Sequence, residues 1–169
     1  MTGTLAATMA VGPLALFALS ALSPFVTTDL GLRPSQFGAL ATLSFAAATP
    51  RAWLLGRWLD RCSARGILFG VFSLSGLALL VTASAQSFGW LVVGVLITGV
   101  AMSVTNPVTN RLVSVQVADG QRGAVMGVKQ SGVQLGQLLV GLALPSLAVL
   151  IGWRGAVAAT CLWWPWAWH

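Results

Sequence analysis

Amide side chains recur along one apolar stretch in the second half of the chain, at a spacing that could bind a polar solute. Gln130, Gln134 and Gln137 are four and three residues apart, so they share one face of a helix. An amide that faces hydrocarbon costs several kcal/mol, because nothing there replaces its hydrogen bonds to water. We therefore expect this face to border a water-filled cavity or the interior of a helix bundle. The alternative for each residue is a hydrogen bond that only joins neighbouring helices.

Basic side chains also lie inside apolar stretches, where they could attract negative charge. Arg51 and Lys129 fall within such stretches, whereas the three Asp residues fall in connecting segments. Fixed positive charge without an internal counter-charge favours a small organic or inorganic anion as ligand. The alternative is that both side chains extend along their helices to the membrane interface. Together with polar residues of the preceding helix, the candidate cavity residues are Arg51, Thr105, Asn106, Thr109, Lys129, Gln130, Gln134 and Gln137.

The composition is that of an integral membrane protein. Of the 169 residues, 57% are hydrophobic and 7% are charged, and the mean hydropathy is +0.87. A soluble domain would carry about 25% charged residues. The net charge of +6 would suggest nucleic acid as the partner of a soluble chain, but here the basic residues lie at the ends of apolar runs. We expect a lipid bilayer, that of the cell membrane, as the surroundings and no nucleic-acid partner.

Apolar runs long enough to cross a bilayer predict five helices and the start of a sixth, an all-α integral membrane fold. The first run is too long for the apolar region of a signal peptide. Small residues in the fifth helix, at Gly127, Gly132 and Gly136, would let another helix approach closely. The expected helices span residues 5–26, 35–55, 66–84, 88–108 and 124–150, and the sixth begins at residue 155.

Charge is densest in the connector between the second and third helices, residues 56–65. Asp60 lies just before the third helix, where a carboxylate accepts backbone N–H bonds and meets the positive end of the helix dipole. Gly56 would let another helix approach where the second helix ends. Positive charge marks the cytoplasmic side of a membrane protein, so this connector and the N-terminus are predicted to be cytoplasmic. Seven basic residues lie on or within reach of that side, against two on the other: Arg51, Arg57, Arg61, Arg65, Arg111, Arg122 and Lys129, against Arg33 and Arg154.

The connector has the pattern Gly-x-x-x-Asp-Arg-x-x-x-Arg, which resembles the loop between helices 2 and 3 of the major facilitator superfamily. The stretch from Arg122 to Gly127 is similar to the Arg-Gly-x-x-Met-Gly entry to helix 5 of that family, and Gly152-Trp153-Arg154 is similar to its turn before helix 6. The alternative for the connector is an ordinary basic loop that also carries an Asp. The residues of the loop motifs, for which the resemblance implies a structural or gating role, are Gly56, Asp60, Arg61, Arg65, Arg122 and Gly123.

The resemblance implies a secondary active transporter of a small solute, built from two six-helix halves around a central cavity. This chain would be the N-terminal half, inactive without its C-terminal half. Residues 129–132 are similar to members of the cyanate and nitrate permease kind. Val140-Gly141 and Gly94 depart from the pattern of drug/proton antiporters, which remain an alternative. A second alternative is a non-transporting membrane partner or scaffold protein.

The last seven residues, 163–169, carry four tryptophans where an apolar helix should continue. Read two bases later, their codons encode Val-Ala-x-Gly-x-Ala with x being Leu, Met or Val, which suits a membrane helix. We therefore expect a frameshift within the sixth helix and treat residues 1–162 as the transporter half. The alternative is a true belt of interfacial tryptophans.

Residue combinations typical of enzymes and metal sites do not occur in the sequence. The sole His is in the tail, there is no Tyr, and Cys62 and Cys161 lack the spacing of metal ligands. No glycine-rich phosphate loop is present, so coupling to an ion gradient is expected rather than to ATP. We expect no enzymatic activity, no cofactor and no metal.

Overall fold

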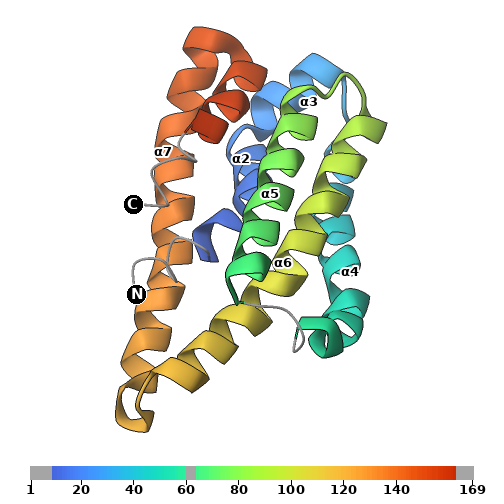
Figure 1. The fold of residues 1–169 in the computed structure, drawn as a ribbon. Helices are drawn as coiled ribbons and strands as arrows, with labels where there is room; N and C mark the ends of the chain where they lie inside the picture. The colour runs from blue at the N-terminus through green and yellow to red at the C-terminus, as the bar shows by residue number, and fades with distance from the viewer. Residues whose placement is uncertain (1–8, 60–63, 163–169) are drawn as a thin grey trace.

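The computed structural model describes residues 9–59 and 64–162, and within these ranges every regular element is a helix (Figure 1). The tail at 163–169, in which the frameshift is expected, lies outside the described residues. The elements are α2 (Leu14–Ala21), α3 (Ser23–Leu30), α4 (Pro34–Leu59), α5 (Ala64–Ala83), α6 (Phe88–Gln116), the 3-10 helix η1 (Asp119–Gln121) and α7 (Arg122–Leu162).

Three helical stretches in the described residues are long and apolar enough to cross a membrane. They are Gly66–Ala83, Phe88–Val115 and Asp119–Cys161. The expectation of an all-helical membrane protein is therefore confirmed. The count of five spans and a sixth stays a prediction.

The first expected helix, residues 5–26, is broken in the structure and runs further. Residues 9–11 are helical, and a turn at Gly12 and Pro13 separates them from α2. A second break at Leu22 precedes Pro24, which has no N–H to donate to the turn before it. The helical path then continues to Leu30, where Gly31 ends α3 in the left-handed conformation, with φ of 59°.

The hydrophobic core lies toward one end of the bundle. α6 packs along both α4 and α5, and α7 packs against α2 and α5. The core residues of α2 and α3 lie between these helices, with Leu19, Leu22 and Val26 fully or almost fully buried. Figure 1 shows this end at the top, beside α3, and we call it the α3 end. At the opposite end α6 and α7 project together and meet at η1, and we call it the η1 end.

The fourth expected helix, residues 88–108, continues as α6 through the whole polar run to Gln116. Pro107 lies inside it without ending it. Buried threonines flank the proline and donate their hydroxyl protons to the helix: Thr105 Oγ1 donates to Ala101 O at 2.8 Å and Thr109 Oγ1 to Thr105 O at 2.7 Å. Polar residues therefore lie within α6 and do not mark its end, because the hydroxyl groups bond to the helix itself.

The fifth expected helix and the sixth form one element, α7, interrupted only at Gly152. That residue has φ of 76° and ψ of 159°, which is not helical. The chain bends there, and residues 153–162 form a separate helical segment that turns back beside α2 and α5 (Figure 1).

Candidate functional site

Lys129 is buried between α6 and α7 near the η1 end. The residue is only 4% exposed, and its Nζ donates a hydrogen bond to Asn110 Oδ1. Lys129 stands seven residues after the start of α7, and Asn110 six residues before the end of α6, so both lie roughly 10 Å along their helices. The ammonium group is thus directed across to α6.

Thr105 and Thr109 lie on the buried face of α6, 2% and 0% exposed. Besides its bond within the helix, Thr109 Oγ1 lies 3.3 Å from the sulfur of Met9. A Cβ built on Gly12 would lie 2.7 Å from Thr105 Oγ1, so the broken start of the chain packs tightly against this face. These threonines therefore lie at a helix contact, and Asn106 is exposed on another side of α6.

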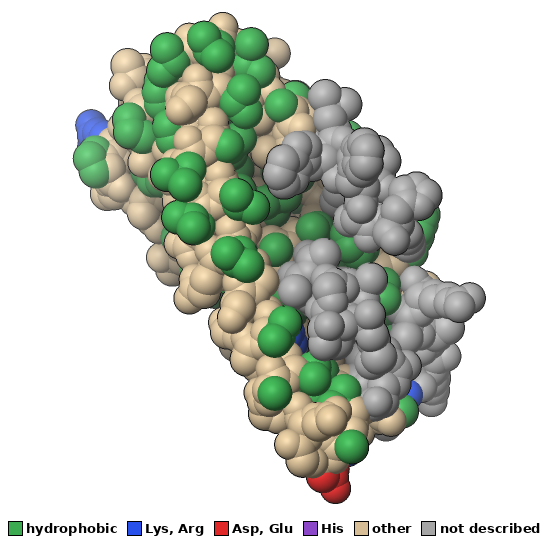
Figure 2. Space-filling view, turned by 90° about the vertical axis from the view of Figure 1, so that its left-hand side faces the viewer, with side chains coloured by type: hydrophobic (Ala, Val, Ile, Leu, Met, Phe, Trp, Pro, Cys, Tyr) green, Lys and Arg blue, Asp and Glu red, His purple; other side chains and the backbone are tan. Residues whose placement is uncertain are grey.

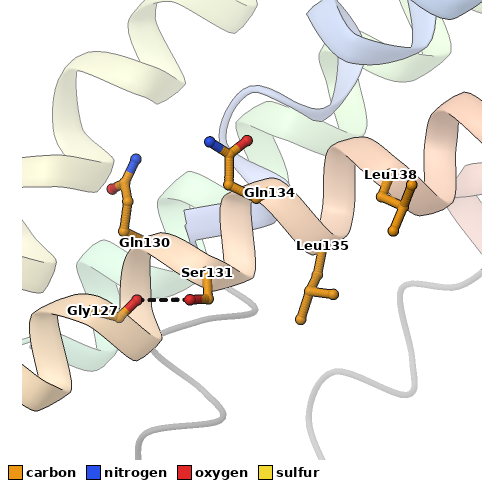
Figure 3. Close-up of a pocket in the computed structure, with 6 residues that line it drawn as sticks. All are labelled: Gly127, Gln130, Ser131, Gln134, Leu135 and Leu138. Carbon is orange, nitrogen blue, oxygen red and sulfur yellow. Dashed lines mark hydrogen bonds between the residues drawn. The ribbon is translucent and has the colours of Figure 1, made fainter.

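The glutamines lie on an exposed face of α7. Gln130 and Gln134 line an open groove of about 480 Å³ together with Gly127, Ser131, Leu135 and Leu138. Figure 3 shows both amides extending to one side of α7 while Leu135 extends to the other, and Ser131 Oγ donates to Gly127 O at 3.0 Å. Gln137 is exposed as well. The groove offers amide donors and acceptors beside apolar side chains.

Much of the remaining α7 surface is apolar. Figure 2 shows the side of the molecule on which α7 lies, with hydrophobic side chains gathered over its upper part. The large exposed apolar side chains of α7 from residue 135 onward are Leu135, Leu138, Leu139, Leu142, Val149, Leu150 and Ile151. The groove, which is itself lined mainly by apolar atoms, thus lies next to a surface that suits lipid or another apolar protein face.

The candidate cavity residues therefore fall into two groups. Lys129 faces α6, whereas Gln130, the next residue, faces the groove, because successive residues on a helix project about 100° apart. The ammonium group of Lys129 and the amides of Gln130 and Gln134 therefore lie on neighbouring sides of α7, in the half nearer the η1 end. The candidate residues did not include Asn110, which accepts the hydrogen bond of Lys129. Its position four residues after Asn106 on the same helix was the signal that could have identified it.

Asp60 and Arg61 lie outside the described residues. Arg51 and Gly56 are part of α4, and Arg65 is part of α5.

Arg122 holds the end of α6. Its Nε donates to Val117 O at 3.1 Å and its Nη2 to Ser114 O at 2.6 Å, and its Nη1 pairs with Asp119 Oδ1. The last carbonyls of a helix have no partner within the helix, so a guanidinium placed there satisfies them. Gly123, beside it, lies in the open, because a Cβ added there would meet nothing within 4 Å.

The three glycines expected to pack do so to different degrees. A Cβ on Gly136 would lie 2.9 Å from the Cβ of Ala10, so α7 approaches the start of the chain closely there. Gly132 is buried, while Gly127 lies in the groove with open space around it. A tighter contact than that of Gly136 is at a glycine that the sequence did not single out. A Cβ on Gly99 of α6 would meet the backbone oxygen of Ser44 on α4.

The chain matches known protein sequences over most of its length. The family model described as Major Facilitator Superfamily matches residues 5–163. Among curated proteins, the uncharacterized transporter YgaY of Escherichia coli O157:H7 and its counterpart in strain K12 are each 32% identical to it over 132 residues. Those matches cover 76% of this chain and 32% of each relative, so the chain spans about a third of their length.

Proposed function

The chain belongs to the Major Facilitator Superfamily, and from this premise we propose that it forms the N-terminal half of a secondary active transporter for a small anion. The relatives it matches are named as transporters, and no enzyme activity is part of the proposal. Because the chain spans 32% of those relatives, we propose that transport needs a second set of helices.

The burial of Lys129 is the observation that supports an anion. Its hydrogen bond goes to a neutral amide, and both described carboxylates bind elsewhere: Asp29 bonds to Arg154 and Asp119 to Arg122. A buried ammonium without a carboxylate partner attracts an anion, since burial strengthens the interaction between charges. The amide of Asn110 uses its oxygen for Lys129, so its N–H groups remain as further donors.

The groove on α7 supports a second part of the proposal, that this face borders the transport pathway. Gln130 and Gln134 have exposed amides on a helix that is long enough to span a membrane. Exposure of two amides to lipid is unfavourable, whereas a wet cavity or the polar face of a second half satisfies them. We propose that the second set of helices lies against this groove.

Transport by a chimera tests the anion proposal. Residues 1–162 replace the part of YgaY that they match, and uptake of labelled nitrate, formate and bicarbonate is measured in reconstituted vesicles. We expect Lys129→Met to reduce uptake of the transported anion at least tenfold, about 1.4 kcal/mol, and Lys129→Arg to retain part of it. Arg33→Gln is the matched control, because it removes one exposed positive charge at the other end of the bundle. Full uptake by Lys129→Met would refute an anion site at this residue.

The open groove also favours one other candidate, a membrane partner protein that binds a second chain through α7 and transports nothing. Replacement of Gln130 and Gln134 by Leu separates the two. Loss of uptake in an assembled chimera supports the transport pathway. A fused chimera that shows no uptake even with both glutamines present, together with loss of co-purification of the separately expressed halves after the replacement, supports the partner protein.

A further inference from the structure

Three parts of the chain that are distant in sequence meet at the α3 end. Asp29 lies at the end of α3, Ala85 in the turn between α5 and α6, and Trp153 and Arg154 at the start of the segment that follows Gly152. Ala85 is fully buried and Trp153 is 5% exposed, so the meeting point is continuous with the hydrophobic core.

The two neighbouring side chains Trp153 and Arg154 bind the same carboxylate oxygen. Trp153 Nε1 donates to Asp29 Oδ2 at 3.1 Å, and Arg154 Nη1 lies 2.8 Å from that atom. Arg154 also donates from Nε to Ala85 O at 3.0 Å, and its guanidinium carbon lies 4.5 Å from the centre of the Trp153 ring. One guanidinium group therefore joins three elements, and it lies over the face of the indole ring.

The geometry depends on the bend at Gly152. Its φ of 76° and ψ of 159° fall in a region that is essentially restricted to glycine. This conformation stops the helix and directs the next two side chains toward α3 and the α5–α6 turn. A continued helix would carry them away from Asp29.

We infer that Asp29, Trp153 and Arg154 form a clasp that makes the α3 end of the bundle move as one body. The clasp fixes α3, the α5–α6 turn and the last helical segment relative to one another. Arg154 is a positioning residue in it, because separate nitrogens of its rigid planar group reach Ala85 O and Asp29 Oδ2, whereas the three donors of a lysine all lie on one nitrogen. Relative motion of the helices is thereby directed to the η1 end. The clasp does not depend on which solute is carried.

Distances between spin labels on the full chain in lipid nanodiscs test this inference. Labels at Thr28→Cys and Ala158→Cys report on the clasp, and labels at Gly70→Cys and Gly120→Cys report on the η1 end, in a background with Cys62 and Cys161 replaced by alanine. All four labelled positions are exposed. We expect Arg154→Gln and Arg154→Lys each to broaden the 28–158 distances and shift them to longer values, with the 70–120 distances unchanged.

Two further variants keep the inference falsifiable if the arginine variants fail to fold. Trp153→Phe retains the ring in the core and removes one N–H donor, so we expect a smaller broadening at 28–158. The double variant Asp29→Arg with Arg154→Asp should have a 28–158 distance distribution narrower than that of Arg154→Gln but broader than that of the unchanged protein. It restores the ion pair without the hydrogen bond from the indole. Unchanged 28–158 distances in the Arg154 or Trp153 variants would overturn the clasp, as would equal broadening at both pairs.

Discussion

Arg122 combines two interactions that a sequence motif cannot distinguish. It pairs with Asp119, whose side chain is 86% exposed, and it donates to the carbonyls of Ser114 and Val117. Exposed ion pairs contribute little, because water screens them. Carbonyls at a helix end lack a donor within their own helix. The bonds from Arg122 to these carbonyls should therefore contribute most of the stability that Arg122 gives to the end of α6.

We therefore predict different outcomes for the two partners of this pair. Arg122→Ala should speed amide hydrogen exchange in the last turn of α6 by roughly five- to thirtyfold, since two bonds are lost and each contributes about 0.5–1 kcal/mol. Asp119→Asn is the control and should change exchange little. Mass spectrometry of peptides covering residues 108–118 measures both. Equal effects of the two variants would show that the ion pair, and not the carbonyl bonds, holds this turn.

Residue type and spacing predicted part of the candidate site. The spacing of Gln130 and Gln134 indicated a shared polar face, and the structure places both in one groove. The partner of Lys129 was not predictable, because the sequence permitted the side chain either to enter the bundle or to extend to the interface. Only the position of α6 beside α7 decides that its ammonium meets Asn110.

At the level of helices, α4 and α6 approach each other closely where they cross at Gly99. A Cβ on Gly99 would meet the oxygen of Ser44 and lie 2.9 Å from the Cβ of Ala47. Ser44 Oγ donates to Val95 O at 3.2 Å across the same contact. Small residues allow backbones to approach this closely in membrane bundles, where packing replaces the hydrophobic effect.

Substitution by alanine at two helical glycines tests this crossing. Gly99→Ala should destabilise the bundle by about 1–3 kcal/mol, because the Ser44 oxygen belongs to the backbone and cannot rotate away. Gly70→Ala of α5 is the matched control, since its surroundings are open, and it should leave stability unchanged or raise it by up to about 1 kcal/mol. Unfolding in detergent mixtures, followed by circular dichroism, measures the difference. Two equal midpoints would rule out a tight crossing at Gly99.

Helix ends were harder to predict than helices. The polar run after Thr105 predicted the end of a helix, yet α6 continues to Gln116 because its threonine hydroxyls bond to the helix itself. One unbroken helix was expected over residues 5–26, whereas breaks occur at Pro13 and before Pro24. Both differences depend on how neighbouring helices support the backbone, and hydropathy does not contain that information.

For the molecule as a whole, membership of the family and the all-helical membrane architecture followed from composition and three short motifs. The number of spans and their orientation remain predictions. Positive charge predicts that the η1 end lies in the cytoplasm and the α3 end outside. Ser87 is exposed in the α5–α6 turn at the α3 end, and Gln121 is exposed in the 3-10 helix at the η1 end.

Cysteine labelling in intact cells tests the orientation. In a background without Cys62 and Cys161, a membrane-impermeant maleimide should label Ser87→Cys from outside. It should label Gln121→Cys only after the membrane is permeabilised. Labelling of Gln121→Cys in intact cells, with Ser87→Cys protected, would reverse the topology.

The bend at Gly152 decides how much of the chain a bilayer can hold. Without it, the 41 residues of α7 would extend as a straight rod of about 60 Å, twice the thickness of the hydrocarbon layer. About half of that rod would protrude into water with its apolar side chains uncovered. The bend at Gly152 therefore shortens the straight part of α7, and residues 153–162 pack back against the bundle.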